Sequence, residues 1–299
     1  MSRIHEALKK AAQERATQTA AGLESCVVEV AGEIQRSIPR ETDLAPSPAR
    51  SPITADSTHV APSCYEELVR RCAHPQWRLC PSSALFGDRT TGRVGAEGFR
   101  TLRSRLCQIA GTRTLRRLLL TSSVAGEGKT FVAANLAQSI IRQPERRVLL
   151  LDADLHVPQL HATLGAPRSP GLTDYLRGDA DECAVIQQGV QENLFLIPAG
   201  TPVSSSDLLL SDKMKHLLDY LTLIFDWIII DSPPALPVHD ASVLADLADG
   251  VLFVLRAGST DADDAGKAAE EFRNKNLLGV VLNQVEKCDS YGDLYYNRK

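Results

Sequence analysis

The chain has 299 residues, enough for one large α/β domain with appendages. Its 43% hydrophobic and 23% charged residues are ordinary for a globular protein, and a net charge of −4 without a basic run argues against a nucleic-acid partner. No apolar stretch approaches the roughly 20 residues that span a bilayer. The charged N-terminus also lacks the apolar centre of a signal peptide. We therefore expect a cytoplasmic protein that reaches the inner face of the plasma membrane through a partner.

The first third of the chain predicts little packed structure. Residues 1–16 are typical of a short helix, because Ile4 and Leu8 follow a helical period. Residues 17–62 are rich in Ala, Ser, Thr and Pro and hold too few large apolar residues to offset chain entropy, which predicts a disordered linker. Residues 63–95 form a lead-in of uncertain structure.

The pattern changes at about residue 96 and continues to residue 285. Short apolar runs, each typical of a buried strand, alternate with segments of helical periodicity. The expected strands are 118–121, 148–151, 194–197, 227–230, 250–255 and 279–282, with helices at 131–142, 213–224 and 264–275. Apolar strands separated by helices indicate a mainly parallel sheet covered on both faces. The sequence predicts a doubly wound α/β domain, followed by a tail at 286–299.

A glycine-rich loop follows the first of these strands, in the segment LLLTSSVAGEGKTFVAANLA. Glycines let backbone N–H groups approach phosphate oxygens, and the start of the next helix adds partial positive charge. A lysine at the end of such a loop reaches the β and γ phosphates, and the following hydroxyl ligates magnesium. Ser123 stands where the full motif has its first glycine. We expect ATP and Mg²⁺ to bind here, at Gly126, Glu127, Gly128, Lys129 and Thr130.

Three aspartates follow other strands of the same sheet. Asp152 and Asp154 end the run VLLLDAD, and Asp231 ends the run WIIID. Ligands of open α/β sheets bind at the carboxyl ends of the strands. We therefore expect all three carboxylates to converge on Lys129, and Thr130, Asp154 and Asp231 to hold the magnesium ion.

These motifs together resemble the bacterial tyrosine kinases, or BY-kinases, of capsule and exopolysaccharide pathways. GEGKT is similar to the Walker A loop of that family, LLLDADLHVPQLH to its Walker A′ segment and IIIDSPP to its Walker B segment. The family usually carries arginine where this chain has His156. GLTDYLRG, PAG and GVVLNQV also have counterparts in the family, so the resemblance covers about residues 95–285.

The resemblance implies transfer of the γ-phosphoryl group of ATP to tyrosine. Lys129, Asp152, Asp154 and Asp231 are then the expected catalytic residues, with Asp152 accepting a hydrogen bond from the incoming tyrosine. A loose transition state needs proton removal only late, so an orienting acceptor suffices. Asn283, which follows a late strand, is a candidate for contacting adenine. We expect loss of Lys129 to abolish phosphorylation without unfolding the domain.

The resemblance also implies self-association and self-phosphorylation. Glu97, Arg100 and Arg103 in EGFRTLRSR are similar to the helix that joins family members into a ring, although Arg105 replaces the asparagine of that motif. The tail holds a short tyrosine cluster, which in the family is the autophosphorylation substrate: Tyr291, Tyr295 and Tyr296. The expected partners are further copies of the chain, a separate transmembrane activator of the polysaccharide co-polymerase type, and a phosphotyrosine phosphatase.

Two other functions remain open from the sequence. The first is an ATPase switch of the ParA or MinD type, which shares the fold but carries a second lysine early in the loop, where this chain has Val124. The second is a regulator of polysaccharide export that binds ATP without acting as a kinase. Incubation with ATP and detection of phosphotyrosine separates the three.

Overall fold

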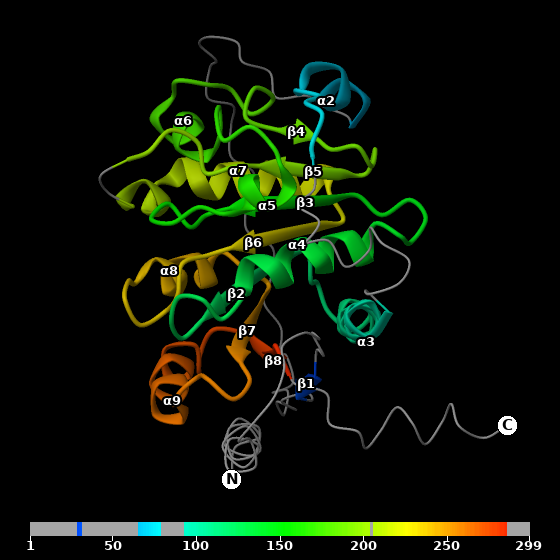
Figure 1. The fold of residues 1–299 in the computed structure, drawn as a ribbon. Helices are drawn as coiled ribbons and strands as arrows, with labels where there is room; N and C mark the ends of the chain where they lie inside the picture. Colours follow the sequence, from blue (N-terminus) through cyan, green and yellow to red (C-terminus); the bar gives the residue numbers. More distant parts are fainter. Residues whose placement is uncertain (1–28, 32–64, 79–92, 204–205, 286–299) are drawn as a thin grey trace, which may run out of the picture.

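The computed structural model describes residues 29–31, 65–78, 93–203 and 206–285. Eight strands form one sheet with the order β1-β8-β7-β2-β6-β3-β5-β4 (Figure 1). The five pairings from β8 to β5 are all parallel, whereas β1 and β4 add antiparallel at the two edges. The prediction of a mainly parallel, doubly wound sheet is confirmed. The strands are β1 Glu29–Ala31, β2 Arg117–Ser122, β3 Val148–Asp152, β4 Gln187–Gln188, β5 Leu194–Ile197, β6 Trp227–Asp231, β7 Gly250–Arg256 and β8 Leu277–Asn283.

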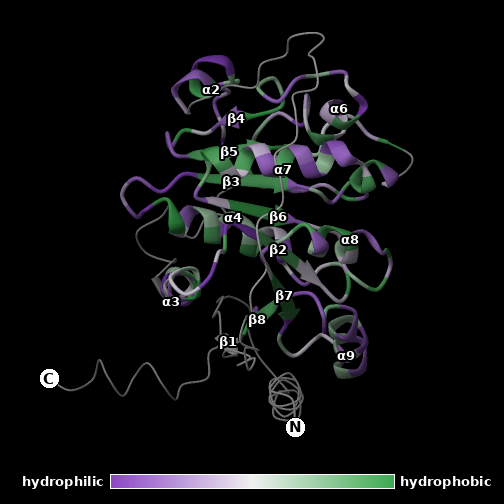
Figure 2. Cartoon of the chain, turned by 180° about the vertical axis from the view of Figure 1, so that it is seen from behind, coloured by the Kyte–Doolittle hydropathy of each residue, from purple (hydrophilic) through white to green (hydrophobic). Residues whose placement is uncertain are grey.

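Helices cover both faces of this sheet. The core on one face contains side chains of α3, α4 and α5, and the core on the other contains those of α6, α7, α8 and α9. Figure 2 shows why: the central strands β3, β5, β6 and β7 are mainly hydrophobic, and much of the surrounding loop surface is hydrophilic. The helices are α2 Tyr65–Arg71, α3 Arg93–Ala110, α4 Lys129–Ile140, α5 Leu160–Leu164, α6 Leu172–Arg177, α7 Asp212–Ile224, α8 Asp240–Asp246 and α9 Ala262–Glu271, with a 3-10 turn η2 at Asp207–Leu210.

The structure describes residues in two of the segments that precede the predicted domain, the linker and the lead-in. Residues 29–31 form β1 and pair with β8, so these three residues of the predicted linker are ordered. Helix α2 lies in the lead-in, where Tyr65 packs edge-on against Phe195. Residues 1–16, the rest of the linker and the tail at 286–299 lie outside the described residues, and the domain division as a whole stays a prediction.

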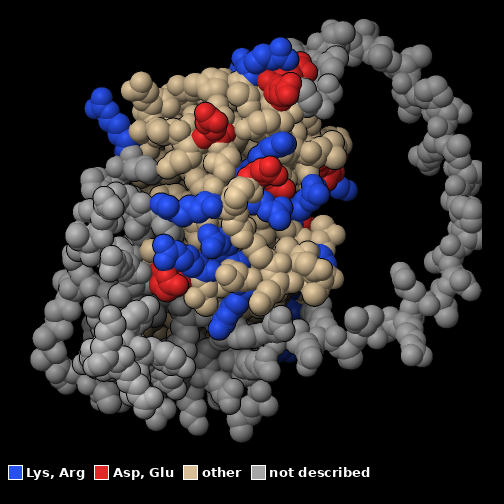
Figure 3. Space-filling model, turned by 90° about the vertical axis from the view of Figure 1, so that its right-hand side faces the viewer, with Lys and Arg blue, Asp and Glu red and all other residues tan. Residues whose placement is uncertain are grey.

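The starts of the strands carry basic side chains that acidic neighbours balance. Arg117 at the start of β2 pairs with Asp219 at 2.6 Å, and Arg146 before β3 pairs with Asp226 at 3.3 Å. The face seen in Figure 3 shows basic and acidic side chains intermingled in this way. The carboxyl ends of β3 and β6 differ, because three aspartates, Asp152, Asp154 and Asp231, lie there beside Lys129.

Candidate active site

The phosphate loop runs from the end of β2 to the first turn of α4. Gly126 has φ +86° and Gly128 φ +90°, backbone conformations that favour glycine. A Cβ on Gly128 would lie 2.0 Å from the side-chain nitrogen of Asn283, so only glycine fits there. Within the described part of the chain, the amides of Ala125, Gly126 and Gly128 donate no backbone hydrogen bond. The loop therefore has the unpaired N–H groups that a phosphate cradle needs.

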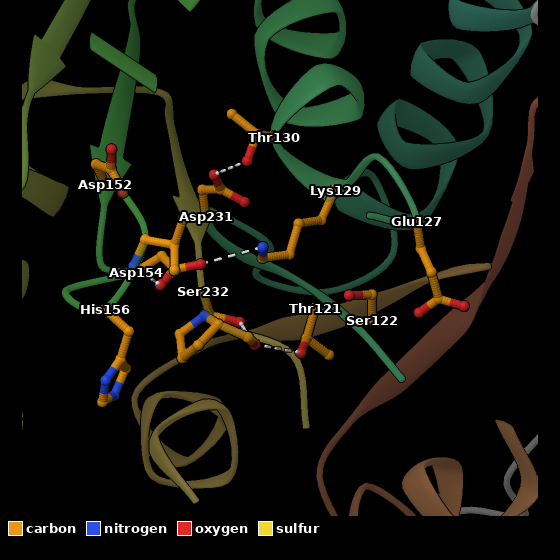
Figure 4. Close-up of polar contacts among 12 residues, drawn as sticks. Thr121, Ser122, Glu127, Lys129, Thr130, Asp152, Asp154, His156, Asp231 and Ser232 are labelled. Atoms are coloured by element: carbon orange, nitrogen blue, oxygen red, sulfur yellow. Dashed lines mark hydrogen bonds and ion pairs between the residues drawn. The ribbon is translucent and has the colours of Figure 1, made fainter. Parts of the chain in front are cut away.

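Thr130, Lys129 and the three aspartates meet beside this loop (Figure 4). Asp152 and Asp231 are aligned partners on the neighbouring parallel strands β3 and β6. The Thr130 hydroxyl donates to Asp231 Oδ2 at 2.6 Å, and Lys129 Nζ lies 3.1 Å from Asp154 Oδ2. The structure thus brings the three aspartates at the strand ends together with Lys129 and Thr130 of the phosphate loop.

The carboxylates of this site are buried with few compensating groups. Asp152 and Asp231 are fully buried, and one oxygen of each has no hydrogen-bond partner among the described residues. Burial raises the pKa of Asp231 to about 7, and Lys129 opposes that rise. Burial and the neighbouring Asp231 charge raise the pKa of Asp152 well above its usual range. A site that holds protons so readily attracts a cation or a donor group.

The loop after β3 winds around two of these aspartates. Asp154 Oδ1 accepts the Val157 amide at 2.9 Å, and Asp152 Oδ2 accepts the Leu160 amide at 3.1 Å. The apex of the loop is held from outside, where His156 Nε2 lies 2.9 Å from Asp240 Oδ2. The sequence did not indicate this last contact, because Asp240 lies 84 positions away.

Two predicted nucleotide contacts have partners within the protein. Asn283 is buried, and its Nδ2 donates to the Glu127 carbonyl at 2.9 Å. The Glu127 side chain is also buried and accepts the Val124 amide at 2.9 Å. Both residues therefore form hydrogen bonds that hold the phosphate loop in place. Adenine contact by Asn283 stays a prediction.

The predicted oligomerisation residues lie on α3, on two different sides of it. Glu97 and Arg100 form an exposed ion pair at 2.5 Å. Arg103 instead points inward and donates to the Ser139 carbonyl on α4 at 2.6 Å. Arg103 therefore fastens α3 to α4 within the chain, and only Glu97 and Arg100 are displayed for a neighbour. The role of all three in self-association stays a prediction.

Comparison with known proteins agrees with this geometry. A family model described as an AAA domain matches residues 119–262, from β2 to the start of α9. The tyrosine-protein kinase YwqD of Bacillus subtilis is 33% identical over 211 residues, which are 69% of this chain and 88% of YwqD. The chain belongs to the bacterial tyrosine-protein kinases.

Other members of this kinase family show the same relationship. The tyrosine-protein kinase Wzc of Salmonella typhimurium is 32% identical over 207 residues, which are 68% of this chain but 29% of Wzc. The solved kinase domain of the Escherichia coli tyrosine kinase ETK superposes with a TM-score of 0.65 and 29% identity, covering 76% of this chain and 88% of that one. The predicted enzyme class, a tyrosine-protein kinase with a P-loop nucleotide site, is confirmed, and the ATPase-switch alternative is not supported.

The kinase contains no membrane-crossing helix within its described ranges. The predicted tyrosine substrates Tyr291, Tyr295 and Tyr296 lie outside these ranges. Phosphorylation of these tail tyrosines at the nucleotide site therefore stays a prediction.

Proposed function

We propose that this chain uses ATP and Mg²⁺ to phosphorylate Tyr291, Tyr295 and Tyr296 of its own tail, and that this reaction regulates capsular or exopolysaccharide synthesis and export. The observation that carries the proposal is the convergence of Lys129, Thr130 and buried aspartates from adjacent strands beside a glycine loop. Membership of the tyrosine-kinase family supports the choice of acceptor.

Lys129 has a partner that ATP binding would replace. Its ammonium group lies 3.1 Å from Asp154, and both side chains are almost buried. Phosphate oxygens at the loop would compete for the same ammonium group and draw it away from Asp154. The exchange would leave Asp154 as a free carboxylate at the moment when phosphate charge arrives.

The residues present fit a magnesium ion shared with the phosphates. No three acidic, histidine or cysteine side chains in the described residues are arranged to enclose a metal by themselves. Magnesium in phosphoryl-transfer sites is usually held by one or two carboxylates together with phosphate oxygens. Asp231 offers an unpartnered buried oxygen, and Thr130 and Asp154 lie beside it. When bound, the ion would neutralise charge on the transferring group.

The chain's own residues then position the reaction. The tyrosine oxygen forms the new bond to the γ-phosphorus as the bond to the β-γ bridging oxygen breaks and ADP leaves. The loop amides and Lys129 hold the phosphates in line, and Asp152 accepts the hydrogen bond of the tyrosine hydroxyl. Burial raises the pKa of Asp152, so its ionised form is a stronger base than that of an exposed aspartate.

The proposed setting is the inner face of the membrane. We propose self-association through Glu97 and Arg100, recruitment by a transmembrane activator of the co-polymerase type, and reversal by a phosphotyrosine phosphatase. The exposed ion pair on α3 is the feature of the structure that supports the first of these.

Incubation of the purified chain with ATP and Mg²⁺, followed by mass spectrometry, tests the proposal. We expect phosphate on the tail tyrosines and none on Tyr175 or Tyr220, because those two rings are partly buried against the core. The variant with all three tail tyrosines replaced by phenylalanine is the matched control. ATP binding without any phosphotyrosine, with activator present, would instead identify a non-kinase regulator.

A further inference from the structure

Glu127 places a carboxylate inside a loop that binds anions. Glu127 is only 2% exposed. The nearby Lys129 does not neutralise its charge, because the ammonium group of Lys129 pairs with Asp154. A negative charge close to phosphates is repelled, and a buried charge is costly to maintain. The position of this carboxylate therefore needs a physical reason.

The carboxylate of Glu127 joins two separate parts of the chain. Its Oε2 accepts the Val124 amide at 2.9 Å, a bond that joins residues 124 and 127 within the phosphate loop. Its Oε1 accepts the hydroxyl of Thr260, a residue of the connection between β7 and α9 that lies 133 positions away. The same Thr260 oxygen accepts the Arg256 amide at 3.0 Å, so Thr260 is itself fixed in place.

The backbone of the same residue is held from another element. Asn283, at the end of β8, donates to the Glu127 carbonyl at 2.9 Å and fills the space where a side chain on Gly128 would lie. Residue 127 is thus fixed through its side chain by the β7–α9 connection and through its carbonyl by β8. These contacts restrain the segment just before Lys129.

The direction of the Glu127 side chain limits the repulsion. Figure 4 shows the carboxylate on the opposite side of Lys129 from Asp154 and Asp231. The negative charge therefore faces away from the group that would meet the phosphates. No other atom of the described residues lies within 4 Å of the place that a Cβ on Gly126 would take, so this side of the loop is open to a ligand.

We propose that Glu127 and Thr260 are a positioning pair that holds the phosphate loop in its ATP-binding shape. The inference rests on the proposed use of ATP. The pair contacts no reacting atom, and it acts through the amides and the lysine that it places. Loss of the pair should lower the affinity for ATP, because the loop must then be ordered each time that a nucleotide binds.

Four single variants and one double variant test the pair. Thr260→Val removes the hydroxyl with little change of shape, and Glu127→Gln leaves one side-chain oxygen for two donors, the Thr260 hydroxyl and the Val124 amide. Thr260→Ser keeps the hydroxyl, and Ser259→Ala changes the neighbouring exposed residue of the same connection. ATP affinity by calorimetry, kinetic constants for tyrosine phosphorylation and melting temperature are measured for each variant.

We expect Thr260→Val and Glu127→Gln each to weaken ATP binding by about 10- to 100-fold, the loss typical of a hydrogen bond to a charged group. The KM for ATP should rise in parallel while kcat stays within about twofold. Thr260→Ser and Ser259→Ala should behave as wild type. The double variant Glu127→Gln with Thr260→Val should be weakened by less than the sum of the two single effects, because the two changes share one contact while each also disturbs a contact of its own.

Two results would overturn the pair. One is wild-type ATP affinity in both Thr260→Val and Glu127→Gln together with a lowered melting temperature, which would show that the contact stabilises the fold and does not serve ATP binding. The other is full additivity in the double variant. A wild-type chain that makes no phosphotyrosine would refute the proposed kinase reaction, and calorimetry of ATP would still decide this inference.

Discussion

Two buried aspartates of this chain have opposite surroundings. Asp174, at the start of α6, accepts the amides of Gly171 at 2.8 Å and Thr201 at 3.2 Å through one oxygen. Burial alone would raise its pKa, but the hydrogen bonds from Thr201 and Gly171 outweigh burial and lower it. Asp231, at the end of β6, has one oxygen bonded to Thr130 and the other without a partner among the described residues, and its pKa rises to about 7.

The difference separates a carboxylate that holds the fold from one that awaits a ligand. Asp174 ties the PAG turn to α6 and is satisfied by the chain itself. Asp231 is fixed by a strand but left short of positive charge, so it lowers stability until something else supplies that charge. Unsatisfied buried groups of this kind cluster at functional sites, which is why their removal can stabilise a protein while abolishing its activity.

The largest expected effect follows from removing the one cation of the cluster. Lys129→Met should abolish ATP binding and reduce tyrosine phosphorylation by at least about 100-fold, because the lysine neutralises phosphate charge. We still expect the variant to fold, but with reduced stability, since Lys129 forms an almost buried ion pair with Asp154. Leaving Asp154 unpaired should lower the free energy of unfolding by about 3 kcal/mol near pH 8.

A second substitution separates the two consequences of that change. Lys129→Met combined with Asp154→Asn removes the stranded charge, so the melting temperature should recover while activity stays absent. Circular dichroism and calorimetry of ATP binding provide the two readings. Wild-type ATP affinity in a folded Lys129→Met variant would refute the site assignment.

Asp231→Asn and Asp174→Asn should change stability in opposite directions. A rise of the Asp231 pKa from its usual 3.8 to about 7 corresponds to at most about 4 kcal/mol of destabilisation above pH 7. The native state binds the extra proton, so this penalty grows as pH rises from about 4 to 7. Asp231→Asn should therefore stabilise the protein most at pH 8 and little near pH 4, while abolishing phosphorylation.

Asp174 follows the reverse rule. Its pKa is depressed in the native state, so its contribution to stability is present above its usual pKa and is lost as pH falls below it. Asp174→Asn should cost about 1–3 kcal/mol at neutral pH through two weakened hydrogen bonds. Urea unfolding of both variants at pH 5 and pH 8 measures the contrast. Destabilisation by Asp231→Asn at pH 8 would contradict the proposed role of that carboxylate.

The sequence predicted the parts of this picture that depend on local pattern. Apolar runs located the parallel strands, and the rule that ligands bind at strand ends brought Asp152, Asp154 and Asp231 to Lys129. It could not show which carboxylate oxygens stay unpartnered, because that depends on atoms from several elements. The contacts of Glu127 with Thr260 and of His156 with Asp240 were missed for the same reason, since each joins residues far apart in the chain.

Two misjudgements have more specific causes. Strand β1 stands at the end of the apolar run CVVEVA, which a composition taken over all of residues 17–62 obscured, and its three residues pair with β8. Arg103 was grouped with Arg100 by helical spacing, yet it follows the buried Phe99 by four positions. That spacing puts Arg103 on the border of the buried stripe, a signal that the sequence did contain.

The smallest expected effect concerns this same pair of arginines. The Arg100 side chain is about half exposed, and within the described ranges it pairs with the exposed Glu97, a contact worth at most about 0.5 kcal/mol. Arg103 donates to a backbone carbonyl of α4, so Arg103→Ala should lower stability by about 1 kcal/mol whether or not a ring forms. A double substitution would therefore mix folding with assembly.

Arg100→Ala alone should leave the melting temperature unchanged, weaken self-association and lower tail phosphorylation. Light scattering at micromolar concentration, with the tail tyrosines replaced by phenylalanine in every sample, measures the assembly. An Arg100→Ala protein that assembles and, with its tail intact, phosphorylates as wild type does would remove Arg100 from the interface and leave α3 with a purely internal role.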